Sequence, residues 1–173
     1  MALIILICAA VAGGALYYTQ EYAFYETVTP KGADDVQMLS VVSLNPETIV
    51  YDNFQAIDAN SSPIRYRACF TTSFSLAMLS ETYVGVVHAT PRNAPDWFDC
   101  FDAEEIGVEL EEGTALAFMG QKNIAYGVDR IIAITDDGRG YVWHDLNECG
   151  DKAYDGTAIG EACPPRPSDA TSN

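Results

Sequence analysis

The first feature of the hydrophobic pattern is an uninterrupted apolar run at residues 2–18, which contains no charged residue and no proline. A helix rises about 1.5 Å per residue, so this run is about 26 Å long, close to the roughly 30 Å hydrocarbon layer of a bilayer. Tyr17, Tyr18 and Tyr22 gather at its C-terminal end, where aromatic rings favour the lipid headgroups. The pattern predicts a transmembrane anchor over residues 1–20.

The alternative for this segment is a signal peptide that is cleaved after export. Such peptides begin with basic residues and end at a small-residue cleavage site, but the first basic residue of this chain is Lys31. Cleavage among the small residues at positions 10–15 would also leave an unusually short apolar core. We therefore expect a retained anchor and a stalk over residues 21–36, which Pro30 and Gly32 bring to an end.

Beyond residue 36, short apolar segments predict strands. The clearest alternation puts one set of side chains on each face of a strand: Ile64, Tyr66, Ala68 and Phe70 on one, and Arg65, Arg67, Cys69 and Thr71 on the other. The last third predicts a meander with an Asp-Gly turn before its final strand, at residues 114–121, 125–135 and 141–146. Residues 36–44 have strand propensity without clean alternation, and residues 75–90 are ambiguous, with a helical turn or two before a strand at 83–87.

One helix is predicted at residues 103–112. Asp102 precedes it and Glu105 follows three residues later, a pattern that resembles a capping box. Apolar residues share one helical face around Ile106, and Gly113 is placed to end the helix.

These elements predict an α+β protein: an N-terminal transmembrane helix, then an antiparallel sheet with one or two helices packed on it. The α+β domain is expected over residues 37–150. Residues 151–173 are rich in turn-forming residues and are expected to form a disulfide-closed loop and a disordered tail.

The cysteines indicate the compartment. Beyond Cys8, which we expect to stay free, no cysteine forms a C-x-x-C motif or joins a histidine at metal-ligand spacing. We expect the disulfides Cys69–Cys100 and Cys149–Cys163, although four cysteines allow three pairings and free thiols in a reducing cytosol are the alternative. Disulfides need an oxidising compartment, so we place the anchor in the inner membrane and the domain in the periplasm.

All charged residues follow the apolar run. The chain has 9 Lys and Arg against 25 Asp and Glu, a formal net charge of −16. Charge of this sign opposes nucleic-acid binding and close docking of the whole domain on anionic lipid. Solubility is a plainer explanation for it than an acidic recognition face.

Several longer strings resemble a known family: "QEYAFYE", "SSPIRYRACFTTS", "WFDCFDAEEIG", "AFMGQKNIAYGVDR" and "DGRGYVWH". With them the chain is similar to an uncharacterised alphaproteobacterial family, a domain of unknown function found in short single-pass membrane proteins. The resemblance extends from the anchor to about Gly150 and implies a fold family without an activity. Some similar proteins carry an automatic histidine-kinase label.

The residues do not support phosphotransfer. Transfer from ATP needs a glycine-rich phosphate loop, metal ligands and a phosphoacceptor histidine on an exposed helix. The chain has no such loop, and His88 and His144 lie beside or within apolar, strand-like segments. Asp145 follows His144, but neighbouring strand residues point to opposite faces, so it is poorly placed to orient a general base. We expect His144 to be structural, with ligand binding as the alternative.

Arg65 and Arg67 are the other candidate ligand-binding residues. On one strand face, their guanidinium groups would be able to hold an anion in a bidentate way. Alternatively, they form ion pairs with acidic residues such as Asp99 or Asp102, which a Cys69–Cys100 disulfide would bring near.

Two further features have plain structural readings. "DLNECG" nearly matches the opening of a calcium loop, but position five is Cys149 and position twelve is Gly156, so we expect no metal and no cofactor. Trp97, Phe98 and Phe101 form an aromatic cluster that is expected in the core, although on the surface it would mark a protein interface.

Two classes of function remain, because no catalytic motif is present. The first is a membrane-anchored extracytoplasmic accessory protein that binds another envelope or membrane protein. The second is a ligand-sensing input domain of a signalling system. An interaction protein should expose an apolar patch without a convergent polar pocket, whereas a sensor should place Arg65 and Arg67 in a pocket.

Overall fold

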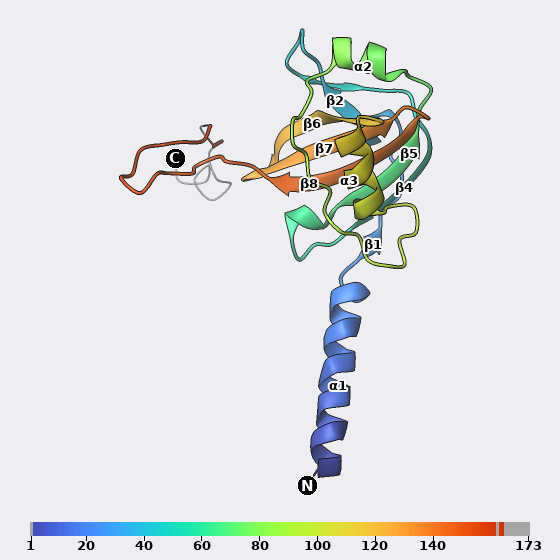
Figure 1. Ribbon diagram of the computed structural model, residues 1–173, viewed down its shortest axis with the longest axis vertical. Helices are drawn as coiled ribbons and strands as arrows, with labels where there is room; N and C mark the ends of the chain where they lie inside the picture. The colour runs from blue at the N-terminus through green and yellow to red at the C-terminus, as the bar shows by residue number, and fades with distance from the viewer. Residues whose placement is uncertain (1, 162, 165–173) are drawn as a thin grey trace.

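The computed structural model describes residues 2–161, 163 and 164. A long N-terminal helix projects from a small α+β domain, and a C-terminal loop leaves the domain to one side (Figure 1). The elements are α1 (Ala2–Glu21), β1 (Glu26–Thr27), η1 (Ala33–Asp35), β2 (Gln37–Leu39), β3 (Pro46–Thr48), β4 (Asp52–Asp58), η2 (Pro63–Arg65), β5 (Arg67–Thr71), α2 (Leu76–Thr82), α3 (Ala103–Glu112), β6 (Ala115–Ala125), β7 (Val128–Thr135) and β8 (Arg139–Leu146). The predicted α+β class with an antiparallel sheet is confirmed.

Within the described residues, six strands form one antiparallel sheet in the order β1-β4-β5-β8-β7-β6, and β2 and β3 form a separate hairpin. The chain after α2 joins the two, since the amide of Val84 donates to Leu39 O and the amide of Met119 donates to Val84 O, both at 2.8 Å. The strand predicted at residues 83–87 is therefore reduced to isolated bridges. These bridges cover the edge of β6, which would otherwise offer unpaired backbone groups.

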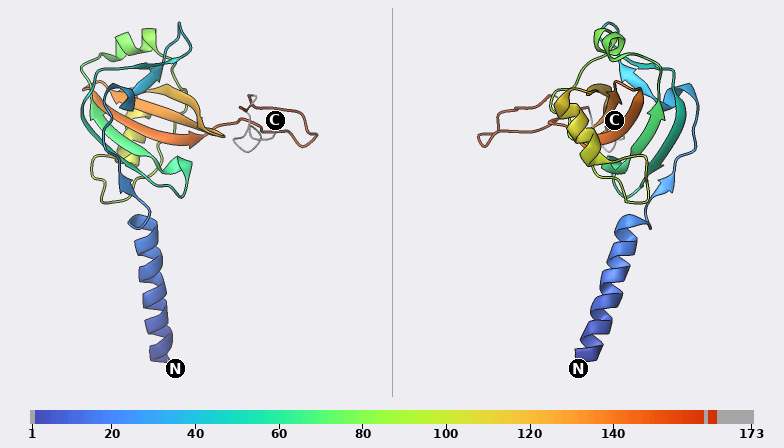
Figure 2. Two further views of the ribbon diagram at one scale, coloured as in Figure 1. Left: turned by 180° about the vertical axis from the view of Figure 1, so that it is seen from behind. Right: turned by 45° about the vertical axis from the view of Figure 1, so that its right-hand side comes forward.

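Both faces of the sheet are buried. Along β7, Ile132 and Ile134 belong to a first core that the β2–β3 hairpin and α2 complete. Ile131 and Ala133 belong to a second core, covered by α3 and the loop before it. Figure 2 shows α3 on one face of the sheet and the β2–β3 hairpin on the other side. Burial on two faces explains why the sequence of β7 is almost continuously apolar instead of alternating.

The ends of α3 follow the sequence prediction. The carboxylate of Asp102 accepts hydrogen bonds from the amides of Glu104 and Glu105, and Gly113 ends the helix in the left-handed conformation at φ 77°. Glu105 does not complete a capping box, because its carboxylate pairs with Arg139 on β8 at 3.0 Å. This pair and the buried Ile106 hold α3 against the sheet.

No residue of helix α1 is buried. Among the described residues it is the one helix long and apolar enough to cross a membrane, by length and composition. The expected stalk is in part joined to the domain: Glu26 and Thr27 form β1, which pairs with β4, and Val28 N donates to Ala56 O at 2.8 Å. Four residues, 22–25, therefore separate α1 from the sheet.

The disulfides are Cys69–Cys100 and Cys149–Cys163, the pairs expected from the sequence, and Cys8 is free. The first joins β5 to the loop before α3. The second closes a loop that extends away from the domain (Figure 1). The expected disordered tail covers residues 164–173, of which 165–173 lie outside the described residues.

Candidate functional site

Arg67 is a structural residue. It lies at the start of β5 and is 4% exposed. Its guanidinium donates to four backbone carbonyls, those of Ile64, Tyr66, Arg92 and Asn93. Burial lowers the pKa of Arg67 to about 10, which leaves it charged at neutral pH. Since all three of its nitrogens already donate, Arg67 fixes the loop at residues 92–93 onto β5 and has no free edge for an anion.

The predicted common strand face of Arg65 and Arg67 is wrong. Pro63 begins η2, a turn of 3-10 helix that includes Arg65, and β5 starts only at Arg67. Proline is favoured at the first position of such a turn, because its φ angle is already fixed near the helical value. Within the described residues no salt bridge includes either arginine, so the alternative prediction of ion pairs is wrong as well.

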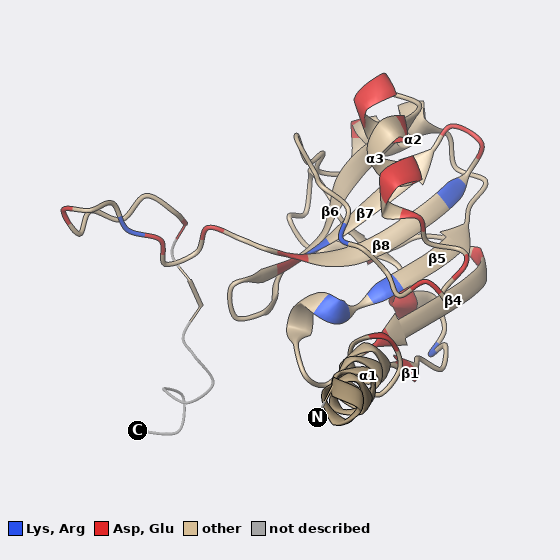
Figure 3. Ribbon diagram, turned by 60° about the horizontal axis from the view of Figure 1, so that its bottom comes forward, with Lys and Arg blue, Asp and Glu red and all other residues tan. Residues whose placement is uncertain are grey.

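Arg65 lies instead over an aromatic ring. Its Cζ atom is 5.4 Å from the centroid of the Tyr25 ring. Its Nη1 is buried and has no hydrogen-bond partner among the described residues. Figure 3, which brings the α1 end of the domain forward, shows basic positions on the ribbon just before β5 and at its start.

His144 holds the turn that carries Arg65. Its ring is buried and stacks on Tyr66 with centroids 4.8 Å apart. Nδ1 lies 2.7 Å from Pro63 O, and Nε2 accepts a hydrogen bond from Arg130 Nε at 3.1 Å. These contacts need a neutral imidazole with its proton on Nδ1. Burial, with help from the nearby cations, lowers the pKa of His144 to about 4.

Asp145 does not orient His144. It points to the other face of β8, where its Oδ1 accepts from Arg92 Nε at 2.9 Å. This agrees with the expectation from strand geometry. His144 therefore lacks the carboxylate partner and the solvent access of a general base, and its contacts are those of a structural residue.

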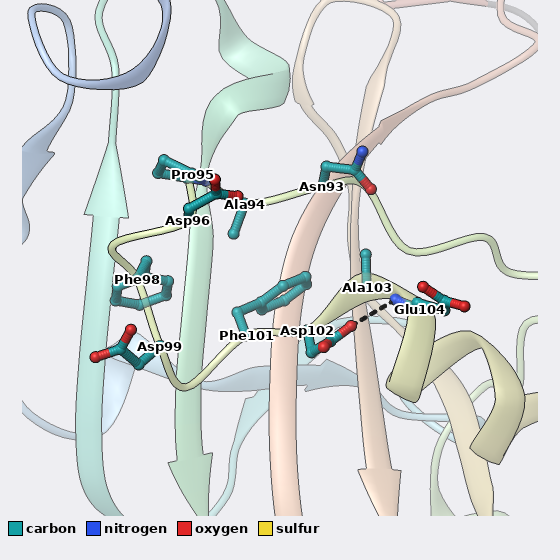
Figure 4. Close-up of a pocket in the computed structure, with 10 residues that line it drawn as sticks. All are labelled: Asn93, Ala94, Pro95, Asp96, Phe98, Asp99, Phe101, Asp102, Ala103 and Glu104. Carbon is teal, nitrogen blue, oxygen red and sulfur yellow. Dashed lines mark hydrogen bonds between the residues drawn. The ribbon is translucent and has the colours of Figure 1, made fainter. Parts of the chain in front are cut away.

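Two cavities lie near these residues. One, of about 590 Å³, is lined by Arg67, the 90–93 loop and Asp145, and does not include Arg65. The other, of about 420 Å³, lies between the 93–99 loop and the start of α3 (Figure 4). Its acidic side chains lie apart, and Asp102 is already used to cap α3. Among the described residues, no group of three or more His, Cys, Asp or Glu side chains could hold a metal ion.

The aromatic cluster divides between the core and the end of α1. Phe98 and Phe101 are buried in the second core, as expected. Trp97 is only partly buried, and its Nε1 donates to Glu21 O, the last residue of α1, at 2.7 Å. Its ring stacks on Tyr22 at 6.4 Å between centroids. Trp97 thus joins the domain to the end of the apolar helix.

An exposed apolar turn lies at the opposite end of the domain. Residues 40–45, the hairpin tip, connect β2 and β3. The turn is closed by hydrogen bonds from Leu44 N to Ser40 O and from Ser40 N to Asn45 O. Val42 is 89% exposed and Leu44 is 68% exposed. The hairpin and α2 lie at the end furthest from α1 (Figures 1 and 2).

The hairpin tip was missed by sequence reasoning, which predicted a strand over residues 36–44. The available signal was the cluster of Ser43, Asn45 and Pro46, which are turn-forming residues. Val41 and Val42 have high strand propensity and so favoured a continued strand. Propensity alone does not show at which residue the hydrogen bonds between two strands stop.

Comparison with known proteins defines the class of this domain. Residues 36–164 match a family of unknown function, DUF6446. The match covers most of the chain, and the chain belongs to this family. It includes the hairpin tip, every strand of the sheet except β1, and both disulfides, and it begins after α1. No curated protein and no solved structure matches the chain.

Proposed function

We propose that this protein is a membrane-anchored accessory protein that binds another envelope or membrane protein through its hairpin tip. The observation that carries the proposal is the exposure of Val42 and Leu44 at the end of the domain furthest from α1. Exposed apolar groups that gather at one place on a small domain mark interaction sites. An anchor adds to this role, because tethering raises the effective concentration of a weak binder near its membrane partners.

The backbone of the hairpin tip adds support. Leu44 has φ 52°, a left-handed conformation that costs an ordinary side chain about 1–2 kcal/mol. Asparagine or glycine would adopt it more easily. A leucine that is both strained and exposed does not stabilise the fold, so a role in binding explains it better.

The charge around the hairpin tip indicates the chemistry of the partner. Neither residues 32–64 nor residues 68–91 contain a Lys or an Arg. Glu47 on β3 and Glu81 on α2 are exposed beside this end of the domain. A complementary partner surface is therefore apolar at its centre and basic at its rim.

We further propose that α1 stays in the inner membrane and that the domain lies in the periplasm. The two disulfides support an oxidising compartment. The alphaproteobacterial origin implied by the sequence resemblance fits an envelope with a periplasm. The histidine-kinase label of similar proteins gains no support, since His144 is buried and fully bonded.

A ligand-sensing role is the alternative that the sequence left open. It predicted a pocket that contains both Arg65 and Arg67. The cavity beside Arg67 excludes Arg65, and the guanidinium of Arg67 is already bonded to the backbone. This arrangement favours the accessory role.

The test is co-purification from native membranes with the full chain. We expect the amount of partner that co-purifies with the variant V42S/L44N to be at least about tenfold lower than with the wild type, because two apolar contacts are lost. The matched control is Val87→Ser, which removes another exposed valine (79%) in the loop before α3. Equal recovery with all three chains would contradict the proposal.

A further inference from the structure

A continuous ladder of rings connects the end of α1 to Arg65. Trp97 is hydrogen-bonded to Glu21 O, and its ring stacks on Tyr22. Tyr25 also meets Trp97 edge-on, at 6.1 Å between centroids. Arg65 lies over the Tyr25 ring, with its Cζ atom 5.4 Å from the ring centroid. We call Tyr22, Trp97 and Tyr25 the aromatic ladder.

Arg65 lacks the polar partners that a half-buried cation needs. Among the described residues its side chain makes no salt bridge, and its Nη1 is buried without a hydrogen-bond acceptor. Leaving a buried charged donor unpaired is costly. The contrast with Arg67, which donates to four carbonyls, shows that the same region is able to satisfy a guanidinium.

The position of the ladder relative to the bilayer suggests the missing partner. The 20 residues of α1 span about 30 Å, so Glu21 lies where the hydrocarbon layer ends. The headgroup layer beyond it is roughly 5–8 Å thick on each side. Trp97 is bonded at this level, and the next rings lead from it to Arg65. Tyr and Trp rings favour this layer, and an arginine reaches toward it along its apolar stem.

We propose that Arg65 binds the phosphate of a phospholipid headgroup in the bilayer that α1 crosses, with the aromatic ladder seated in the same headgroup layer. Because Nη1 is enclosed, the contact is assigned to Nε and Nη2, which are not buried and have no hydrogen-bond partner among the described residues. A guanidinium is the side chain best suited to phosphate, through such paired charge-assisted hydrogen bonds. One such contact beside the anchor fixes how the domain is turned relative to the membrane, and so directs the hairpin tip away from it. This inference rests on the proposed retention of α1.

The test uses the full chain, labelled with ¹⁵N in its arginines, in nanodiscs of phosphatidylcholine. Dipolar dephasing of guanidinium ¹⁵N by lipid ³¹P reports direct contact. We expect dephasing in the wild type, its loss in Arg65→Gln, and its retention in the matched control Arg92→Gln, whose side chain pairs with Asp145 instead. Dephasing that persists in Arg65→Gln would overturn the proposal.

Two further arms identify the source of the phosphate. In nanodiscs of galactosyl diacylglycerol, which lack phosphate, the wild type should show no dephasing, even after inorganic phosphate is added. Dephasing by free phosphate would mean a soluble-anion site and would contradict the lipid assignment. Intact mass is measured first: a chain without residues 2–21 overturns the anchor and this site together, whereas an intact chain without dephasing overturns this site alone.

A second readout does not depend on the label. Amides of residues 22–28 should exchange with deuterium about tenfold more slowly in phosphatidylcholine than in galactolipid nanodiscs, the change expected from one charge-assisted hydrogen bond. Arg65→Lys should keep part of this difference and Arg65→Gln should lose it. The same exchange in both lipids for the wild type would contradict the proposal.

Discussion

The two ends of the domain expose apolar groups in opposite ways. At the α1 end, Trp97, Tyr22 and Tyr25 contact one another, and Trp97 is bonded to Glu21. At the far end, Val42 and Leu44 extend into solvent from a strained turn. The mutually packed rings of the α1 end suit contact with a fixed surface such as the bilayer, whereas the solvent-exposed side chains of the hairpin tip suit binding to a protein partner.

The difference also appears in the bonds beneath each end. The α1 end is supported by the Cys69–Cys100 disulfide, by Arg67 and by His144. The hairpin tip is held mainly by its own turn and by one hydrogen bond from Val41 N to Thr82 O. Variants should therefore affect stability at the first end and binding at the second.

The largest effect is expected from removing the Cys69–Cys100 disulfide. Replacing both cysteines by serine should lower the free energy of unfolding by about 4 kcal/mol, because a loop of about 30 residues is no longer closed in the unfolded chain. The pair C149S/C163S should mainly open its own peripheral loop. Urea unfolding of the full chain in detergent micelles checks this. An equal decrease in the free energy of unfolding for the two double variants would contradict the distinction between the α1 end of the domain and the peripheral C-terminal loop.

Arg67→Gln should be the next most damaging change, lowering stability by about 3 kcal/mol, since several buried carbonyls lose their donor at once. Arg65→Gln is the control. In detergent without phospholipid it should not lower stability, because among the described residues the Arg65 side chain has no hydrogen bond or salt bridge to lose and leaves one buried donor unpaired. The same unfolding experiment measures both, and a large loss for Arg65→Gln would show that it is structural after all.

Stability at the α1 end should depend on pH through His144. Its pKa is about 4 in the folded chain and about 6.5 when unfolded, so the unfolded state takes up a proton first as pH falls. The contribution is complete above pH about 6.5, is lost between there and pH about 4, and amounts to roughly 2–3 kcal/mol. His144→Gln should show a flatter pH dependence of urea unfolding in this window. Curves with the same slope would contradict the assignment.

The smallest effect is expected at the hairpin tip. Leu44→Asn should leave stability within about 0.5 kcal/mol of the wild type, since the loss of an exposed side chain is offset by relief of the left-handed backbone. Thermal unfolding of the full chain measures this. A clear destabilisation would mean that Leu44 stabilises the fold, which would contradict the argument that this residue is kept for binding.

Patterns that depend on neighbouring residues were predicted well from the sequence. The apolar run gave α1, Asp102 and Gly113 gave the ends of α3, and the Asp-Gly turn placed the final hairpin. Contacts between distant segments were not predicted. The hydrogen bond from Trp97 to Glu21 and those from Arg67 to distant carbonyls join residues far apart in the sequence, so no local pattern of residues predicts them.

Alternation also misled where a turn interrupted it. Pro63 starts η2 and shifts Arg65 out of the strand, although the residues from 64 to 71 alternate without a break. The alternation implied one polar face, whereas both faces of β5 are buried, with Cys69 in the second core and Arg67 bonded to backbone. Burial on two faces is a property of the whole sheet, which a single segment does not reveal.

The most direct test of the contrast between the two ends is photo-crosslinking in native membranes. A benzoylphenylalanine is placed at Phe24, exposed in the link between α1 and β1, or at Val42 in the hairpin tip, always in the full chain. We expect lipid adducts from position 24 and a discrete protein adduct from position 42. Lipid adducts from position 42, or a chain that has lost residues 2–21 and leaves the membrane, would contradict it.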